Sequence, residues 1–171
     1  MTRKLINQVR QNKRKAQQEF YYKYLIQMFR LTNRYVNNEQ DAGSIVNIGF
    51  YKIFTNINKF IYHNEKSFIA WMKKIIINEA LIFLRQKFIY NDLEDNQPDL
   101  FHSENVHENN LLIEDYYNLI RKLPNDLRTV FNLYAIDGFS HKEIAAQLNI
   151  KESSSRVYLT RARKILMKNL S

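Results

Sequence analysis

The chain has 171 residues and carries 26 lysines and arginines against 17 acidic residues, a formal net charge of +9 that suits a polyanionic partner such as a nucleic acid. It holds no cysteine, which excludes disulfides, thiolate zinc sites and cysteine nucleophiles. No apolar run is long enough to span a bilayer and the N-terminus lacks the apolar core of a secretory signal, so we expect a cytoplasmic protein that binds no membrane.

The first half of the chain predicts three helices after a basic segment at residues 3–15. The second helix, residues 39–55, and the third, residues 67–87, have apolar residues at helical spacing. A connection at residues 57–66 is rich in aromatic and basic side chains. The first helix, residues 11–36, has apolar residues three or four positions apart, namely Phe20, Tyr24, Met28, Leu31 and Tyr35.

The composition changes in the middle of the chain. Residues 91–108 contain six acidic residues and no lysine or arginine, and their apolar residues have no sustained period. This pattern predicts a flexible linker at residues 89–108, between a domain at residues 1–88 and another at residues 109–171. Two histidines of the linker lie near glutamates, but nothing there fixes a coordination geometry, so we expect no metal site.

After the linker, the sequence predicts a helix at residues 110–123 and a further helix that begins at Pro124. Ser140 and Glu143 have the spacing of a capping box, which predicts the start of a short helix. Residues 149–151 interrupt the helical pattern before a last helix. Two short helices joined by a tight turn form a helix-turn-helix.

The last helix is expected to begin at Ser153 or Ser154, either of which can cap it. Its apolar stripe leaves a polar and basic outer face. Arginine matches guanine edges with two hydrogen bonds, while lysines and hydroxyls reach phosphates. We therefore predict DNA contact rather than a merely solvated basic helix. The predicted DNA-binding residues are Ser153, Ser154, Arg156, Val157, Thr160, Arg161 and Lys164.

Two stretches carry a resemblance to a known family. The stretch "LPNDLRTVFNLYAIDGFSHKEIAAQLNIKESSSRVYLTRARKIL", residues 123–166, has the leucine-proline, valine-phenylalanine and "EIA" positions of that family. The stretch "SFIAWMKKIIINEALIFLR", residues 67–85, matches its promoter-melting helix. The chain thus resembles the extracytoplasmic-function sigma factors, the smallest class of the sigma-seventy family. The resemblance implies an all-α fold with two small helical domains, region two and region four, joined by a flexible acidic linker.

This resemblance implies a bacterial transcription initiation factor, not an enzyme, that needs no cofactor. Region four would read the minus-thirty-five promoter element, and region two would melt the minus-ten element and hold an unpaired base. The implied partners are promoter DNA, core RNA polymerase through its clamp and flap regions, and an anti-sigma factor or an accessory recruiting protein. The residues implied at the melted, single-stranded element are Lys59, Phe60, Tyr62, His63, Asn64, Lys66, Lys74 and Asn78.

The helix at residues 39–55 is where the family binds the polymerase clamp. The resemblance assigns this contact to Asp41, Ile45, Asn47, Ile48 and Phe50. Family members have acidic residues and a glutamine along this helix, and the chain departs from that pattern at Gly43, Ser44, Asn47 and Ile48. Two other readings are therefore kept. One is a stand-alone helix-turn-helix regulator with a helical partner-binding domain, and the other is an interaction protein whose charge acts non-specifically.

Overall fold

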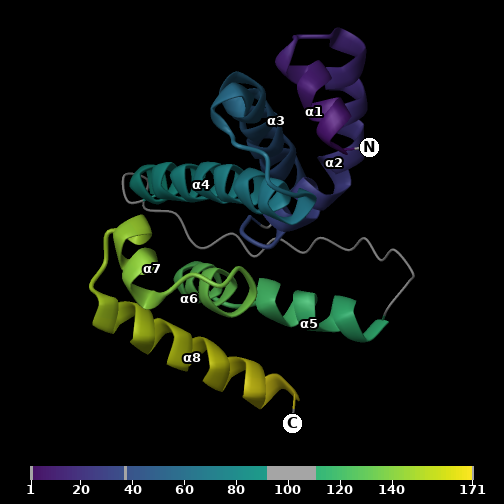
Figure 1. Ribbon diagram of the computed structural model, residues 1–171. Coiled ribbons are helices and arrows are strands. Elements are labelled where there is room, and N and C mark those ends of the chain that lie inside the picture. The colour runs from purple at the N-terminus through teal and green to yellow at the C-terminus, as the bar shows by residue number, and fades with distance from the viewer. Residues whose placement is uncertain (1, 37, 92–110, 171) are drawn as a thin grey trace. The chain divides into compact units, whose positions relative to one another are not determined.

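The computed structural model describes residues 2–36, 38–91 and 111–170 (Figure 1). Within these ranges every regular element is a helix and there is no strand. The protein is therefore all-α, as the sequence predicts.

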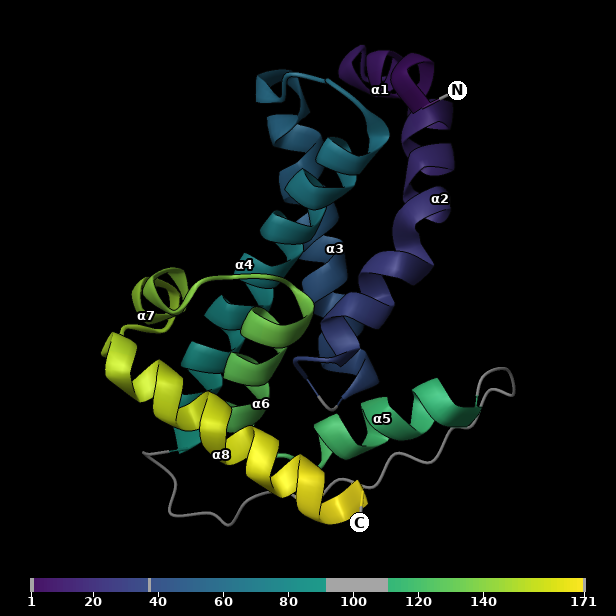
Figure 2. The same cartoon turned by 60° about the horizontal axis from the view of Figure 1, so that its bottom comes forward.

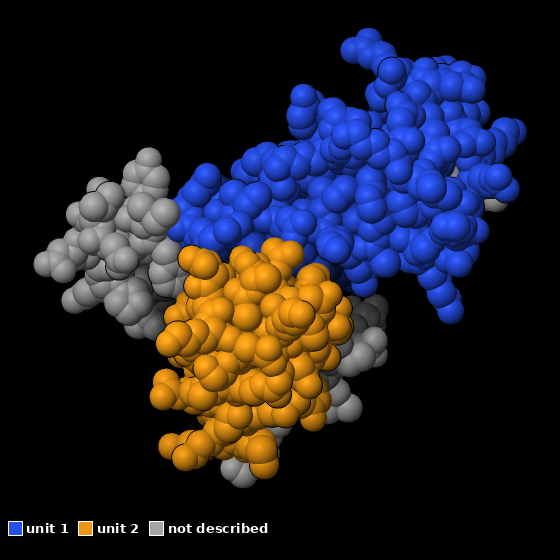
Figure 3. All heavy atoms as spheres, turned by 60° about the vertical axis from the view of Figure 1, so that its left-hand side comes forward, with its two compact units in different colours: residues 1–100 blue, residues 101–171 orange. Residues whose placement is uncertain are grey.

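The chain divides into two compact helical units, residues 1–100 and residues 101–171 (Figure 3). The division falls inside the predicted linker, residues 89–108. Helix α4 continues to Asn91, so the third helix is longer than its sequence pattern indicates. The rest of the linker, including the two histidines considered as metal ligands, lies outside the described residues.

Unit 1 is a bundle in which α2, α3 and α4 pack against one another, with α1 beside α2 (Figures 1 and 2). Its elements are α1 (Thr2–Arg10), α2 (Arg14–Asn33), α3 (Glu39–Asn56), the short 3-10 turn η1 (Ile57–Lys59) and α4 (Glu65–Asn91). The apolar face predicted for the first helix is buried in this bundle.

Helix α1 was not predicted, because the sequence pattern there is dominated by basic residues. Leu5, Ile6 and Val9 nevertheless lie at helical spacing, and all three are buried. They face α2 and η1, so a tertiary contact stabilises a helix of only nine residues. Asn12 has φ 55° in the turn between α1 and α2, a left-handed conformation that asparagine tolerates better than most residues. The first predicted helix, residues 11–36, corresponds to α2, and α1 precedes it in the segment predicted only to be basic.

Aromatic rings from three helices meet at the centre of unit 1. Phe20 of α2 is completely buried, and its ring centroid lies 6.2 Å from that of Phe50 on α3 and 5.7 Å from that of Phe68 on α4. Both pairs have the edge-to-face geometry that aromatic rings prefer. This cluster fixes the three helices relative to one another.

A glycine sets the distance between α3 and α4. A Cβ atom added to Gly49 would lie 2.2 Å from Cδ1 of Ile76, a side chain that is itself completely buried. Any larger residue would force the two helices or the Ile76 side chain to move. Gly43, one and a half turns earlier, has open space around its Cα, so no steric demand explains it. The two glycines of this helix therefore differ: Gly49 meets a packing requirement, and Gly43 does not.

Unit 2 consists of short helices packed on the long last one. Its elements are α5 (Leu111–Arg121), α6 (Asn125–Phe131), a π-helical segment η2 (Asn132–Ile136), α7 (His141–Leu148) and α8 (Glu152–Leu170). Leu123 and Leu127 pack with Ala162 of α8 in the core. Gly138 has φ 77°, a left-handed conformation that glycine adopts readily where a helical segment ends.

A buried arginine ties α5 to α6. Arg128 is only 2% exposed and donates hydrogen bonds to the carbonyl oxygen of Arg121 at 2.9 Å and to Oδ1 of Asn125 at 2.7 Å. Burial and the charge of Arg121 lower the pKa of Arg128 to about 10, so the guanidinium stays protonated at neutral pH. The arginine thereby satisfies a carbonyl at the end of α5, where the helix itself offers no donor.

The helix-turn-helix predicted from the sequence is present as α7 and α8. Ser140 and Glu143 form the expected capping box at the start of α7. Asn149 ends α7 in the left-handed conformation, with φ 55°. The last helix begins at Glu152, so the prediction that Ser153 or Ser154 caps it is wrong. Ser155 N already bonds to Lys151 O at 3.2 Å, which places both serines inside the first turn.

Candidate nucleic-acid interface

Helix α8 has one side in the core of unit 2 and the other in solvent. Ser155, Leu159 and Ala162 are buried. Ser154 is half-buried. The remaining residues of the predicted DNA-binding face are exposed, namely Ser153, Arg156, Val157, Thr160, Arg161 and Lys164. The structure thus brings a serine, a threonine and three cations onto one accessible helix face; their DNA contacts stay a prediction.

Arg156 is held within its own helix. Its Nη2 forms an ion pair of 2.5 Å with Oε1 of Glu152, one turn earlier. Thr160 donates a hydrogen bond of 3.0 Å from its hydroxyl to the carbonyl oxygen of Arg156. Both members of the ion pair are well exposed, so the pair contributes little to stability. Its effect is to place a carboxylate beside a side chain that the sequence assigns to DNA.

A histidine at the start of α7 links the two helices of the motif. The ring of His141 stacks on Tyr134 of η2, with centroids 4.4 Å apart, and its Nδ1 lies 2.9 Å from Oγ of Ser155. The Arg163 guanidinium lies 5.9 Å from the centroid of Tyr134. Burial and neighbouring arginines of α8 lower the pKa of His141, so the ring is neutral near pH 7. The sequence analysis missed this contact, because only the π-helical turn brings Tyr134 to the motif.

In unit 1, the connection between α3 and α4 is fixed at both ends. Arg10 of α1 donates hydrogen bonds from Nε to the carbonyl oxygen of Ile57, at 3.3 Å, and from Nη2 to that of Phe60. At the other end, Asn64 Oδ1 accepts a hydrogen bond of 2.8 Å from Ser67 N. Asn64, rather than Ser67, is therefore the residue that caps α4.

Aromatic packing holds the middle of the connection against α4. The Phe60 ring lies 4.9 Å from that of Trp71 and 5.3 Å from that of Phe68. Tyr62 also approaches Phe68, at 6.3 Å. Phe60 and Tyr62 are half-buried, so each has one side in the protein and only part of its surface for a ligand. Only the exposed part of each ring is therefore accessible for the predicted contact with an unpaired base.

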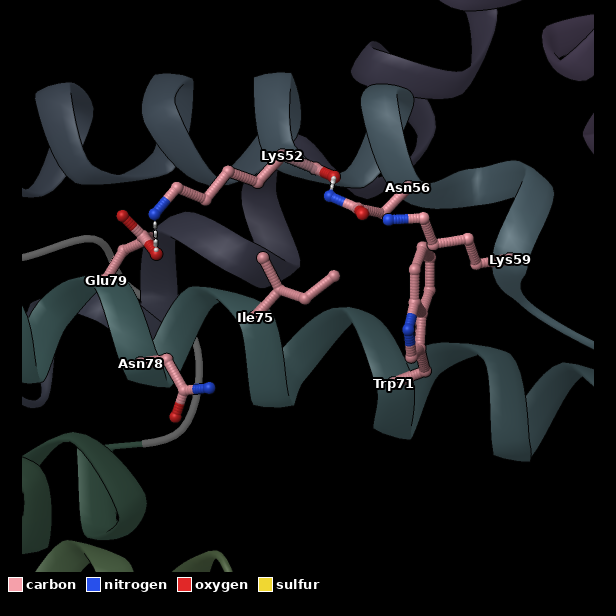
Figure 4. A pocket seen from close by; sticks show the side chains of 7 residues that line it. All are labelled: Lys52, Asn56, Lys59, Trp71, Ile75, Asn78 and Glu79. Carbon is pink, nitrogen blue, oxygen red and sulfur yellow. Dashed lines mark hydrogen bonds and ion pairs between the residues drawn. The ribbon is translucent and has the colours of Figure 1, made fainter. Parts of the chain in front are cut away.

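Next to this connection, α3, η1 and α4 surround a cavity of about 290 Å³ (Figure 4). Its lining combines an indole, an aliphatic side chain, two amides, two lysines and one carboxylate, from Lys52, Asn56, Lys59, Trp71, Ile75, Asn78 and Glu79. Lys52 Nζ and Glu79 Oε1 form an ion pair of 2.7 Å on one side of it. Such a lining has the chemistry to hold a single nucleobase, because the indole can stack on the face of the base and the amides can form hydrogen bonds with its edge.

The structure places the remaining residues predicted at the single-stranded element as follows. Asn78 lines the cavity and is half-buried. The others belong to the connection or to the first turns of α4 and are exposed, namely Lys59, His63, Asn64, Lys66 and Lys74. Lys59 also lines the cavity, which the sequence analysis did not predict.

The polymerase-binding set predicted on α3 requires a correction. Ile45 and Phe50 are 1% and 2% exposed and belong to the core, so neither side chain faces a partner. Asp41 is half-buried, while Asn47 and Ile48 are exposed. The error arises because apolar residues of an amphipathic helix fit both a core and a docking face, and only the packing decides between them.

Ile48 also lines a second, smaller cavity between α3 and α4. Ile82 and Phe83 of α4 contribute to the same lining, which is mostly apolar. The sequence analysis noted that Ile48 is one of the positions where the chain departs from the family pattern. The structure places this departure beside Ile82 and Phe83 of α4. Among the residues that the structure describes, no helix is long and apolar enough to cross a membrane.

Comparisons with known proteins identify the class to which this fold belongs. Residues 20–87 match the family model "Sigma-70 region 2", and residues 113–166 match "Sigma-70, region 4". The two matches correspond to the helices of unit 1 and unit 2. The chain therefore belongs to the sigma-70 family of transcription initiation factors, which bind core RNA polymerase and promoter DNA and are not enzymes.

Curated relatives place the chain in one class of that family. It is 25% identical over 175 aligned positions to the ECF RNA polymerase sigma-E factors of Haemophilus influenzae and Escherichia coli, covering 95% of this chain and 91% and 90% of theirs. The fold is similar to that of RpoE in complex with the anti-sigma factor NepR from Bartonella quintana (TM-score 0.59, 20% identity, 89% of this chain and 96% of that one). It is also similar to CnrH in complex with the cytosolic domain of CnrY (TM-score 0.51, 20% identity, 98% and 96%). The chain is an extracytoplasmic-function sigma factor.

Proposed function

We propose that the two units divide promoter recognition between them, with unit 2 reading the minus-thirty-five element as a duplex and unit 1 opening the minus-ten element. The observation that carries this proposal is the basic, accessible face of α8 on a complete helix-turn-helix. The N-terminal part of such a second helix enters the major groove in proteins of this type. Sigma-70 family members bind core RNA polymerase, which is the enzyme that transcribes from the recognised promoter.

For unit 2, the contacts divide by chemistry. Arg156 and Arg161 have the forked geometry that reads guanine, whereas Lys164 is suited to a phosphate. Val157, which is 45% exposed among these cations, suits the methyl group of thymine. Sequence preference therefore depends on the arginines and on Val157, and overall affinity depends on the lysine.

For unit 1, the cavity in Figure 4 is the proposed site for an unpaired base of the nontemplate strand. Its indole and amides suit the face and the edge of a base. The exposed lysines of the connection suit the phosphates on either side. The ion pair between Lys52 and Glu79 reduces the positive charge at one wall, so the strand is expected to run along the Lys59 side.

The polymerase contact is proposed on the exposed side of α3, around Asn47 and Ile48, rather than on the buried residues. Because this side lacks the acidic residues of related factors, we propose a docking surface that relies on apolar contact. An accessory recruiting protein would compensate for lost ion pairs by tethering the factor near its promoter. The partners named in the two similar complexes also suggest control by an anti-sigma factor, and all of this would take place in the cytoplasm.

Substitutions on α8 test the duplex-reading role. We expect Arg161→Ala to cost about 1–3 kcal/mol of upstream-element binding by the holoenzyme, with relaxed preference at one base position. We expect Lys164→Ala to weaken binding to all sequences alike and to flatten its dependence on salt. The measurement is a competition assay with upstream elements randomised one position at a time. Unchanged affinity and preference in both variants would remove α8 from DNA recognition and favour the interaction-protein reading.

The stand-alone regulator reading makes a different prediction. Such a protein would bind a duplex site tightly without polymerase, whereas a sigma factor requires core polymerase for strong promoter binding. The same competition assay, run with and without core polymerase, separates the two.

A further inference from the structure

The contact between His141 and Ser155 lies where the start of α7 meets the first turn of α8. The Ser155 side chain is completely buried, and its hydroxyl oxygen lies 2.9 Å from Nδ1 of His141. Arg156, the first arginine of the exposed face of α8, follows Ser155 directly in the chain. A buried hydroxyl needs a hydrogen-bond partner, because its desolvation is otherwise unfavourable. The imidazole of His141 supplies that partner beside the DNA-binding face predicted on α8.

The middle of α8 is held by apolar packing. Leu159 and Ala162 are buried, and Ala162 packs with Leu123 and Leu127. Apolar attraction has no preferred direction, whereas a hydrogen bond weakens steeply as its geometry departs from the ideal. The bond to Ser155 therefore restrains the rotation of the first turn of α8 more sharply than the apolar contacts do.

The imidazole ring is itself held in place by η2. It stacks on Tyr134 with an angle of 21° between the ring planes, and the guanidinium of Arg163 on α8 lies 5.9 Å from the centroid of the same tyrosine ring. A hydrogen bond of 2.9 Å from Asp137 N to the carbonyl oxygen of Asn132 closes the wide turn of η2. Single π-helical turns of this kind often occur at functional sites. The elements η2, α7 and α8 therefore meet around the ring of His141.

We propose that His141 is a positioning residue for duplex reading, and that its hydrogen bond with Ser155 sets the orientation of the first turn of α8 and thereby of Arg156. This inference rests on the proposed role of unit 2 and deepens it by assigning a residue outside the exposed face of α8. An arginine that reads a base edge needs a defined direction, whereas contacts with phosphates carry no sequence information. The expected signature is a loss of base preference with little loss of overall affinity.

Two substitutions of His141 separate the hydrogen bond from the ring. His141→Phe keeps a ring that can stack on Tyr134 but cannot bond to Ser155, whereas His141→Asn removes the ring and keeps an amide in the place of Nδ1. The measurement is competition for the holoenzyme among upstream elements randomised one position at a time. We expect His141→Phe to lower base preference about three- to tenfold, as the loss of one hydrogen bond implies, and to change the affinity averaged over all sequences by less than about twofold. The loss should fall at the position where Arg156→Ala relaxes preference, and His141→Asn should keep most of that preference.

Ser155→Ala removes the same hydrogen bond from the other side. We expect it to match His141→Phe, and we expect the double variant to be no worse than either single variant, since two residues that act through one bond are not additive. Asn125→Ala is the matched control, because it removes a hydrogen bond of 2.7 Å with Arg128 from another part of unit 2. It should lower the melting temperature and leave base preference unchanged. Thermal unfolding of each full chain, followed by circular dichroism, gives the stability of every variant.

Three results would overturn the inference. Wild-type base preference in His141→Phe removes the positioning role, and an equal loss of preference in Asn125→Ala makes the effect a general loosening of unit 2. An equal loss of affinity for all sequences in His141→Phe, with a flatter dependence on salt, makes His141 a phosphate contact instead. Failure of the proposed function itself is distinguishable, because the wild-type holoenzyme would then show no upstream preference and Arg161→Ala would change nothing.

Discussion

Single residues on the proposed DNA-reading face of α8 are held by contacts within the helix. Arg156 forms its ion pair with Glu152 at the N-terminal turn of the helix. The free backbone N–H groups of such a turn are also a favourable position for a phosphate. The helix dipole stabilises a carboxylate in this position, but the same carboxylate repels the phosphates of a DNA backbone. If α8 binds DNA as proposed, we expect Glu152 to limit the affinity of the protein for the duplex.

We expect Glu152→Gln to increase the affinity of the holoenzyme for its upstream element by about two- to fivefold, since exposed ion pairs contribute only about 0–1 kcal/mol. The gain should shrink as salt is raised. Asp126→Asn is the matched control, because it removes one exposed negative charge from unit 2 without changing α8. Fluorescence anisotropy at two salt concentrations is the measurement. Equal affinity of the two variants would mean that Glu152 does not restrain DNA binding.

The exposure of individual residues was predictable where it follows from helical spacing and not where it depends on packing between elements. The exposed face of α8 follows from the positions of Leu159 and Ala162. The burial of Ile45 and Phe50 does not follow from spacing, since α3 packs on both α2 and α4. The contact between His141 and Ser155 required the register of two helices, which no local pattern specifies.

At the scale of elements, the two glycines of α3 differ in their explanation. Gly49 meets a packing requirement, whereas nothing in the structure explains Gly43. Gly49 allows Ile76 of α4 to approach the α3 backbone. Gly43 has no such neighbour, and it lies in a helix where glycine is less favourable than alanine by about 1 kcal/mol. The structure therefore gives opposite signs for the same substitution at two positions six residues apart.

We expect Gly43→Ala to stabilise unit 1 by about 0.5–1 kcal/mol and Gly49→Ala to destabilise it by about 1–3 kcal/mol through overpacking against Ile76. Urea denaturation of the full chain, followed by the fluorescence of Trp71, measures both free energies of unfolding, because this single tryptophan lies in unit 1. Each variant serves as the control for the other. Destabilisation by Gly43→Ala would show that its backbone needs glycine for a reason that the packing does not reveal.

The helices themselves were largely predictable, because their apolar residues are regularly spaced. The capping box of Ser140 and Glu143 is a local signal, and it located α7 correctly. Helix α1 was missed since three apolar residues among many cations are a weak signal, and its stability depends on contact with η1. The same contact brings Arg10 to the connection, so the missed helix and the missed hydrogen bonds of Arg10 have one cause.

At the scale of the whole molecule, the proposed function gives the two units different surfaces for the duplex form and the opened form of the same DNA. Unit 2 presents a straight basic helix, which suits a duplex groove. Unit 1 presents a cavity with an indole and amides, which suits an extruded base. The formal net charge of +9 favours association with DNA in general, and we propose that these two surfaces provide the selectivity. The division of labour between them is the central claim of this account.

The measurement that tests it most directly is transcription by core polymerase plus this chain from a library randomised across forty base pairs, about four turns of DNA, followed by sequencing of the productive templates. We predict two enriched blocks at a constant spacing. Arg161→Ala should erase preference in the upstream block alone, and exchange of residues 58–66 should alter the downstream block alone. A single enriched block, or variants that change both blocks together, would contradict the assignment of duplex reading to unit 2 and strand opening to unit 1.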